Sequence, residues 1–192
     1  MQDFLPFGAM EQNREKTAIL AFLEGHGIPY RIYSHPKTDT LPEKLENDRR
    51  AGVENALHCK NLVLANRQKT RFYLLTMPFG KRFRTGPVSR QMASGRLSFA
   101  EEGILAGILH TRSGSVSPLE LIFDENREIA FFVDRDLLSA ERICFHPSEE
   151  TCTVVLERED FFRLFLPALG IEAGVVTVEE EEEKKLEEVS SK

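Results

Sequence analysis

The chain has 192 residues, 41% of them hydrophobic and 29% charged, with a formal net charge of −6. This length fits one domain with short appendages, and the apolar content is enough for a sizeable core, which excludes disorder throughout the chain. No run of about 18 apolar residues could span a membrane, and MQDFLPFGAM lacks the features of a secretory signal. Three cysteines without C-x-x-C spacing indicate reduced thiols, so we expect a cytoplasmic protein.

The predicted elements begin with a helix over residues 13–25, where apolar residues recur at helical spacing. A short alternating strand follows over residues 28–35. Residues 41–52 predict a polar helix, with Pro42 in its first turn and Gly52 at its end. Next, NLVLAN and RFYLLTM are separated only by RQKT, which predicts an antiparallel hairpin.

Strands and helices continue to alternate in the rest of the chain. After a basic loop over 78–87 we expect a short helix over 88–95, a strand over 96–100, a helix over 100–110, a strand in 124–134, a helical turn over 135–141, strands over 142–147 and 151–157, an amphipathic helix over 158–170 and a last strand over 173–179. This pattern predicts an α/β fold, a single domain with a mixed, partly antiparallel β-sheet flanked by helices. The expected organisation is an N-terminal extension (1–12), the folded domain (13–178) and an acidic solvated tail (179–192).

Charge is distributed unevenly along the chain. Residues 179–192 hold seven acidic residues and three lysines, whereas residues 49–96 hold eleven basic residues and one acidic residue. A basic segment inside an acidic protein indicates a positive face that attracts phosphates. The alternative is that these side chains point in several directions and pair with acids from elsewhere.

Lys60 and Asn61, in HCKNLVL, precede residues with the pattern of a buried strand. A lysine there either keeps its ammonium in water or directs it into a cleft, and Asn61 adds a neutral donor and acceptor suited to a carbonyl or a phosphate. Positive neighbours lower the pKa of a thiol such as that of Cys59. Alternation, however, places Cys59 and Lys60 on opposite sides of an extended backbone, and no acyl-transfer motif is present, so we do not expect a nucleophilic cysteine.

His146 ends a predicted strand before Pro147, and His35 has the same His-Pro form. Such a histidine either bonds a nearby carbonyl or lies at the rim of a cleft. No histidine pair has metal-ligand spacing, so no metal site is expected. In GSVSPLE, Ser117, Pro118 and Glu120 fit a capping box that starts a helix. Because a helix start also gathers amide donors, this segment suits both a cap and a binding loop.

Taken in order, these segments resemble the YbaK/ProX family of aminoacyl-tRNA editing domains. Within it they are most similar to the free-standing branch associated with prolyl-tRNA synthetase, which clears alanine from tRNA for proline. The resemblance covers residues 17–178 and is carried by FLEGHGIPYRIYSHP, CKNLVL, FYLLTMP with the basic GKR, GRLSFA, GSVSP, VDRDLL and CFHPSEETCTV.

The resemblance implies the YbaK/prolyl-tRNA-synthetase-associated domain fold and hydrolysis of the ester that joins a wrong amino acid to tRNA. It assigns Lys60 as the main functional residue, which orients the aminoacyl ester or the terminal phosphate. The substrate-binding residues that it implies are Asn61, Gly114, Ser115, Val116, Ser117, Pro118 and His146. It implies no metal, no cofactor and no covalent intermediate: water attacks, assisted by the neighbouring ribose hydroxyl.

The expected partner is mischarged tRNA, most of all Ala-tRNA(Pro), with a transient association with prolyl-tRNA synthetase. The residues expected to bind acceptor-stem phosphates are Arg49, Arg50, Lys81, Arg82 and Arg84.

Three features depart from the family pattern: Glu150 replaces an asparagine, Gly80 replaces an acidic residue, and residues 85–89 lack a lysine. They leave two alternatives open, a catalytically silent binder of aminoacyl-tRNA or an amino acid that acts as a regulator, and a deacylase for Cys- or Ser-tRNA.

Overall fold

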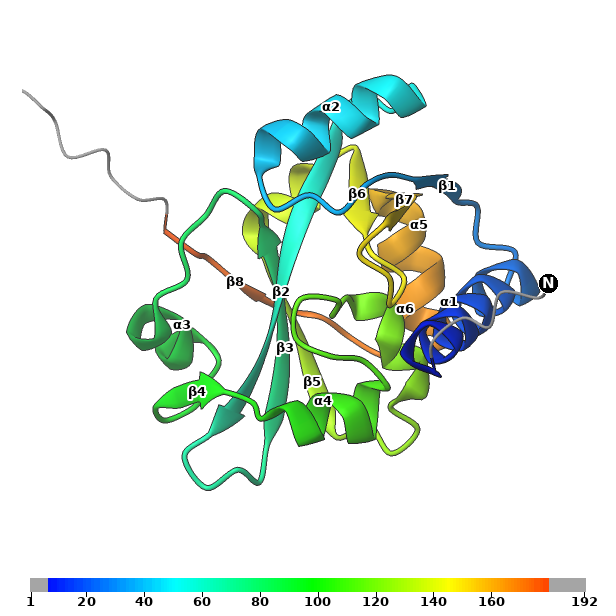
Figure 1. Cartoon of the computed structure of the whole chain (residues 1–192). Helices are drawn as coiled ribbons and strands as arrows, with labels where there is room; N and C mark the ends of the chain where they lie inside the picture. Colours follow the sequence, from blue (N-terminus) through cyan, green and yellow to red (C-terminus); the bar gives the residue numbers. More distant parts are fainter. Residues whose placement is uncertain (1–6, 180–192) are drawn as a thin grey trace, which may run out of the picture.

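In the computed structural model, which describes residues 7–179, eight strands form one mixed β-sheet (Figure 1). The strands are β1 (Arg31–Ser34), β2 (Ala56–Asn66), β3 (Phe72–Pro78), β4 (Leu97–Phe99), β5 (Ile129–Asp134), β6 (Arg142–Phe145), β7 (Cys152–Glu157) and β8 (Gly174–Val176). Their order is β1-β7-β6-β2-β3-β5-β8, and β4 pairs with β2 outside this path. Parallel and antiparallel pairs both occur, which confirms the predicted mixed α/β sheet.

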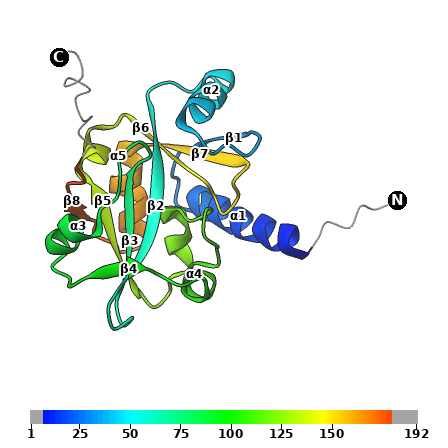
Figure 2. The same cartoon turned by 60° about the vertical axis from the view of Figure 1, so that its left-hand side comes forward.

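Helices lie against this sheet, as Figure 2 shows from a second direction. They are α1 (Phe7–Gly25), α2 (Leu41–Ala51), α3 (Thr85–Gln91), α4 (Glu102–Leu109), the 3-10 helices η1 (Pro118–Phe123) and η2 (Arg135–Ser139), and the consecutive segments α5 (Arg158–Asp160), η3 (Phe161–Phe165) and α6 (Leu166–Ala168). None of the helices in the described part of the chain is long and apolar enough to cross a membrane.

The first helix begins at Phe7, six residues before the predicted start at residue 13. Residues 1–6 and 180–192 lie outside the described residues, so most of the predicted acidic tail and half of the N-terminal extension fall there. The predicted helix over 41–52 is confirmed in detail, since Thr40 and Glu43 form a capping box and Gly52 ends the helix with φ of 64°.

The strands bury side chains on both faces of the sheet. On one face Val63, Leu74 and Phe131 join a large core with Leu23 of α1 and Phe161 of η3. The opposite face packs against α3 in a smaller cluster that includes Leu64, Leu75, Met77, Val88 and Met92. Because side chains pack against both faces of β2, this strand is a rigid support for Lys60 and its neighbours.

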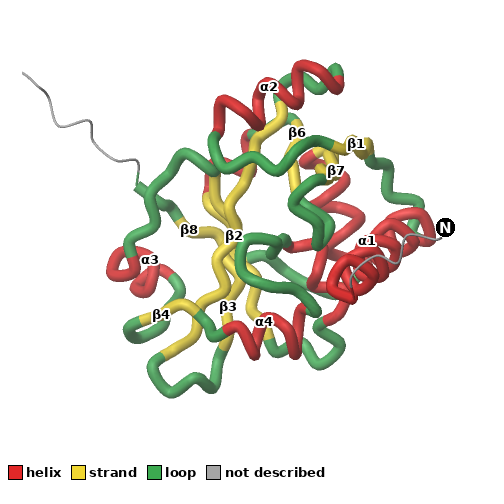
Figure 3. Tube along the Cα trace, in the orientation of Figure 1, coloured by secondary structure: helices red, strands yellow, loops and turns green. Residues whose placement is uncertain are grey.

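Strand β2 has one edge that is only partly paired. On that edge residues 56–58 pair with β6 and residues 64–66 pair with β4, whereas the other edge pairs with β3. No described strand pairs with residues 59–63 on the partly paired edge. The loop between α4 and η1 lies beside this part of β2 (Figure 3), where Asn61 Nδ2 bonds the Val116 carbonyl oxygen. Residues 59–62 (CKNL) therefore lie on an edge of β2 that no described neighbouring strand covers.

Candidate functional site

A cavity of about 330 Å³ lies at the open edge of β2. Four consecutive strand residues line it, Cys59 to Leu62, although alternate residues of a strand point to opposite faces. An unpaired edge explains this, because a cavity beside the edge reaches both faces. Five of the eight residues assigned by resemblance to catalysis or substrate binding meet here: Lys60, Asn61, Gly114, Val116 and His146.

Lys60 lies within β2, which begins at Ala56, rather than before the strand as its sequence context suggested. Its backbone is fixed opposite Met77 in the β2–β3 ladder. Burial lowers the pKa of the Lys60 ammonium, because the charged form loses hydration there. A rigid strand thus holds a cation at the cavity.

Asn61 holds the loop that forms the opposite wall. Its Nδ2 donates a hydrogen bond of 2.9 Å to the Val116 carbonyl oxygen, and its Oδ1 accepts one of 2.8 Å from Thr76 Oγ1. The amide is therefore already engaged at both ends. These hydrogen bonds hold the loop against β2, and contact of Asn61 with the substrate stays a prediction.

The loop from Gly114 to Pro118 starts a helix, as predicted. Ser117 Oγ accepts a hydrogen bond of 3.2 Å from the Leu119 N–H, and the Glu120 carboxylate accepts one from the Ser117 N–H. The helix is a six-residue 3-10 helix, η1. Ser115, Ser117 and Pro118 are buried and do not line the cavity, in contrast to Gly114 and Val116.

Gly114 adopts a conformation that favours glycine, with φ of 92°. A Cβ at this position would lie 2.9 Å from Glu150 Oε1. Glu150 also pairs with Lys37, whose Nζ lies 2.9 Å from Glu150 Oε2. The glutamate that departs from the family pattern is thus a wall of the cavity.

Glu120 connects the loop that contains Ser117 to the segment after His146. Its Oε1 accepts hydrogen bonds of 2.8 Å from both the N–H and the Oγ of Ser148, two residues after His146. Burial raises the pKa of the Glu120 carboxyl to about 7, although these donors oppose the rise. One buried side chain therefore fixes the Ser117 and Ser148 loops relative to each other.

His146 is held between two partners. Its Nδ1 lies 2.9 Å from the Cys152 carbonyl oxygen, so Nδ1 carries the hydrogen and Nε2 is the acceptor. Lys44 Nζ lies 3.4 Å from that Nε2. Burial lowers the pKa of His146 to about 4, which keeps the ring neutral near pH 7.

The cavity lacks an activated nucleophile among its described residues. Burial raises the pKa of the Cys59 thiol, which disfavours the thiolate, as the sequence led us to expect. Neither Ser113 nor Thr38 donates a hydrogen bond to a histidine or a carboxylate that lines the cavity. Acyl transfer to a side chain is therefore not supported by this geometry.

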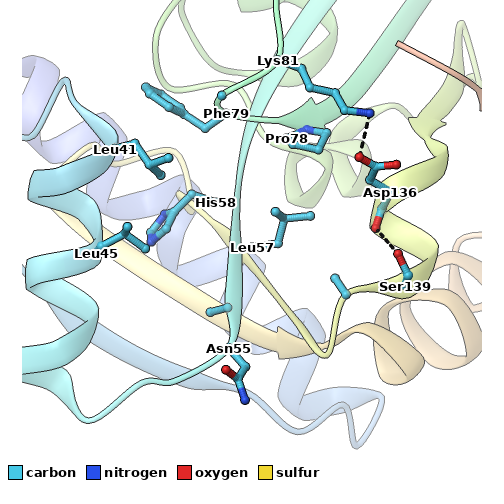
Figure 4. Close-up of a pocket in the computed structure, with 13 residues that line it drawn as sticks. Leu41, Leu45, Asn55, Leu57, His58, Pro78, Phe79, Lys81, Asp136 and Ser139 are labelled. Carbon is cyan, nitrogen blue, oxygen red and sulfur yellow. Dashed lines mark hydrogen bonds and ion pairs between the residues drawn. The ribbon is translucent and has the colours of Figure 1, made fainter. Parts of the chain in front are cut away.

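The residues predicted to bind tRNA differ in their exposure and in their ion-pair partners. Lys81 is buried, and its Nζ lies 3.0 Å from Asp134 and 2.7 Å from Asp136 (Figure 4). Here the structure differs from the prediction, because the two aspartates neutralise Lys81 inside the fold. Arg49 and Arg50 are exposed and both pair with Glu46, while Arg82 and Arg84 are exposed before α3.

A second, larger cavity of about 730 Å³ opens between α2, the adjoining ends of β2 and β3, and η2 (Figure 4). Leu41, Leu45, Leu57 and Pro78 give it a largely apolar lining. It shares Phe79 with the smaller cavity. None of the residues predicted to act in catalysis lies here.

One group of described residues has the composition of a metal site: Asp48, His58 and Cys144, whose ligand atoms lie within 4.8 Å of one another. Its carboxylate is already engaged, since Oδ2 lies 2.7 Å from His58 Nε2 and Oδ1 accepts a hydrogen bond from Tyr33. Tyr33 and His58 therefore bind both carboxylate oxygens of Asp48 in a buried hydrogen-bond network. The absence of a functional metal remains a prediction.

Sequence reasoning missed Lys44, Phe79, Lys37 and Asp39, which also line the smaller cavity. Lys44 belongs to α2 and is buried together with Asn47 and Asp48 on the same face of that helix. Their spacing i, i+3, i+4 places them on one helical face, but it does not indicate whether that face is buried.

Comparison with known proteins places this chain in a family. The family model for the aminoacyl-tRNA editing domain matches residues 35–164. The chain is 29% identical over 150 residues to the prolyl-tRNA editing protein ProX of Acetoanaerobium sticklandii, covering 78% of this chain and 89% of that protein. It is 28% identical over 147 residues to the mouse prolyl-tRNA synthetase associated domain-containing protein 1, covering 74% of this chain and 84% of that protein.

A solved structure assigned as a candidate trans-editing enzyme for prolyl tRNA synthetase has the same fold. It matches with a TM-score of 0.62 at 18% identity, covering 86% of this chain and 98% of that one. The family match spans all the cavity residues contributed by β2, the loop before η1 and the segment after β6. The chain therefore belongs to the aminoacyl-tRNA editing domain family.

Proposed function

We propose that this protein is a trans-acting aminoacyl-tRNA deacylase that hydrolyses Ala-tRNA(Pro), with Lys60 as its principal catalytic residue. Membership of the editing-domain family supports deacylation as the reaction, and the ProX relative supports tRNA for proline as the substrate. The observation that carries the proposal is the cavity itself. It places the ammonium of Lys60, whose backbone is paired with β3, beside a backbone loop, and its described residues offer no activated nucleophile.

Water is the attacking group in this proposal. An ester is an activated acyl compound, so positioning the water and stabilising the negative charge that develops on the carbonyl oxygen are sufficient. Lys60 supplies positive charge for that oxygen or for the terminal phosphate. The ribose hydroxyl beside the ester assists the water, and neither His146 nor Cys59 is required as a base or nucleophile.

The loop at Gly114 and the Glu150 carboxylate form the amino-acid side of the cavity. We propose that Glu150 accepts a hydrogen bond from the α-ammonium group of the aminoacyl ester. Because Gly114 and Glu150 lie so close together, this side of the cavity suits an aminoacyl group with a small side chain. Such a site completes a double sieve, because a synthetase pocket for proline discriminates poorly against the smaller alanine, by about 1–3 kcal/mol.

The tRNA body is proposed to lie along the exposed arginines Arg49, Arg50, Arg82 and Arg84. Lys81 is left out of this surface because Asp134 and Asp136 bind it inside the fold. Association with prolyl-tRNA synthetase is a further part of the proposal, suggested by the names of the relatives.

The decisive experiment measures amino-acid release from tRNA(Pro) charged with alanine or proline and from Ser-tRNA and Cys-tRNA. We expect release of alanine well above the buffer rate, with the proline ester spared. Faster release of serine or cysteine would change the assigned substrate. Binding of the charged tRNA without turnover would instead favour a regulator, for which the Glu150–Lys37 pair inside the cavity is the supporting observation.

A further inference from the structure

The lysines of this protein differ in whether a carboxylate neutralises them. Six lysines fall in the described part of the chain, and four of them have a carboxylate oxygen within 4.0 Å. These four pairs are Lys16–Glu149, Lys37–Glu150, Lys69–Glu101 and Lys81 with Asp134 and Asp136. The other two, Lys44 and Lys60, both line the smaller cavity.

Lys44 is the more deeply buried of these two cations, with only 7% of its surface exposed. A lysine whose stem is anchored while its ammonium stays in water would be more exposed than this. Its Nζ lies 5.3 Å from the centroid of the Phe79 ring, a weak cation–π contact. Burial lowers the pKa of Lys44, although Asp39, Glu150 and Asp48 oppose the change.

His146 directs this ammonium without neutralising it. The Cys152 carbonyl fixes the hydrogen on Nδ1, and the free Nε2 lone pair faces Lys44 at 3.4 Å. A neutral imidazole accepts one of the three N–H bonds of the ammonium and leaves its charge intact. The arrangement therefore holds an unneutralised cation at a set place in the cavity wall.

A buried charge that no carboxylate contacts within ion-pair distance destabilises the folded protein, so its retention points to an anionic ligand. The aminoacyl group cannot be that ligand, because its α-ammonium is positive and its carboxyl is esterified. The anions nearest to the ester are the phosphates that link the terminal nucleotides of tRNA.

We infer that Lys44 is a substrate-binding residue that binds a phosphate of the single-stranded CCA end beside Lys60, and that His146 is its positioning residue. The inference rests on the proposed function and deepens it. It adds a contact with the CCA end to α2, the helix that also carries Arg49 and Arg50, which are proposed to bind the tRNA body.

The test uses the full chain and an uncharged RNA hairpin that ends in single-stranded CCA, with binding measured by calorimetry at several salt concentrations. We expect Lys44→Gln to weaken binding about tenfold and to reduce the slope of log K against log salt by about 0.7, the value for one contact to a single strand. Lys44→Arg should retain most of the affinity. Lys69→Gln, which removes an exposed paired lysine, is the matched control and should change little.

Two outcomes would overturn the inference. The first is Lys44→Gln binding with the affinity and salt slope of the unmodified protein. The second is an equal loss for a hairpin that lacks CCA, since that would place the contact elsewhere on the RNA. Thermal melting of each variant separates a loss of binding from a loss of folding, and Lys44→Arg covers the case in which the glutamine variant does not fold.

Two further measurements distinguish phosphate binding by Lys44 from a catalytic role and test His146 as its positioning residue. Lys44→Gln should raise KM for Ala-tRNA(Pro) with little change in kcat; a fall in kcat alone would assign it to the reacting ester and reject the phosphate contact. His146→Phe should also weaken hairpin binding, with no additional loss in the Lys44→Gln background. If the protein binds the hairpin through Lys44 but releases no alanine, the proposed deacylase is rejected while the phosphate site stands.

Discussion

The two cavities that share Phe79 differ in size and in electrostatics, and the smaller one holds the lysines that no described carboxylate neutralises. The larger one, about 730 Å³, is mostly apolar, and its lysine, Lys81, is neutralised by two aspartates. The smaller one, about 330 Å³, contains Lys44 and Lys60, which have no carboxylate partner within ion-pair distance among the described residues. In this protein the uncompensated charge, and not the volume, marks the cavity that we propose as the ligand site.

The reason is energetic. An apolar groove on the surface costs little to maintain, whereas a desolvated cation costs several kcal/mol unless something neutralises it. In the larger cavity the fold provides that neutralisation through Asp134. In the smaller cavity the substrate is proposed to provide it, so substitutions in the two places should have separable effects on activity and stability.

The largest expected effect is on catalysis in the smaller cavity. Lys60→Ala should lower kcat for Ala-tRNA(Pro) by about 100- to 1,000-fold, the usual cost of losing one group that stabilises developing charge. Single-turnover deacylation measures this directly, and the melting temperature should hardly change because Lys60 has no ion-pair partner to lose among residues 7–179. Activity within threefold of the unmodified protein would remove Lys60 from the reaction.

The matching substitution in the larger cavity should affect stability instead. Lys81→Met leaves Asp134 buried with only backbone donors, from Asp136 and Val178, and should cost about 3 kcal/mol of unfolding free energy. Urea unfolding measures the loss, and kcat/KM of the folded fraction should stay unchanged. A tRNA affinity that falls without any loss of stability would restore Lys81 as a phosphate ligand.

The third prediction concerns the loop of the smaller cavity. Gly114→Val places a branched side chain at φ of 92° and against Glu150 Oε1, 2.9 Å from the new Cβ, so kcat/KM should fall about 100-fold. Ser115→Ala, at a buried hydroxyl outside the cavity lining, should change activity less than threefold. If both variants were equally active, the loop would serve only to start η1.

The fourth prediction concerns Glu120, which supports that loop and should affect the stability of the fold. The pKa of Glu120 is about 7 in the folded protein, above the usual 4.5, so the folded state holds a proton that the unfolded chain releases. Its contribution to stability is complete below pH 4.5 and falls by about 2 kcal/mol between pH 5 and pH 7. Urea midpoints against pH should show this decline, and Glu120→Gln should flatten it. An identical pH profile in the variant would assign the decline to other groups.

Much of the fold follows from local patterns, which explains why the predicted elements were found. The hairpin of β2 and β3, the capped α2 and the Ser117 cap each depend on residues close in sequence. The cavity depends on residues far apart. Nothing near Lys81 indicates its partner Asp134, 53 residues away.

The same reason explains why Lys44 was missed. The helix from Leu41 to Ala51 has no apolar stripe, which is typical of a solvated helix, yet it buries Lys44, Asn47 and Asp48. Their burial is set by packing of α2 over β2 and by His146, 102 residues from Lys44. Charge and spacing in the sequence could not distinguish this buried polar face from an exposed one.

The smallest expected effect tests the larger cavity itself. Leu45→Gln adds a polar group to its lining at a half-exposed position of α2 and keeps a residue with good helix propensity. If the groove takes no part in the reaction, kcat/KM should change less than twofold, and binding of the CCA hairpin should be unaltered. A loss above tenfold in a variant with normal melting would instead place part of the RNA in the groove. Because Phe79 borders both cavities, such a result would make the groove an extension of the site formed by Lys44 and Lys60.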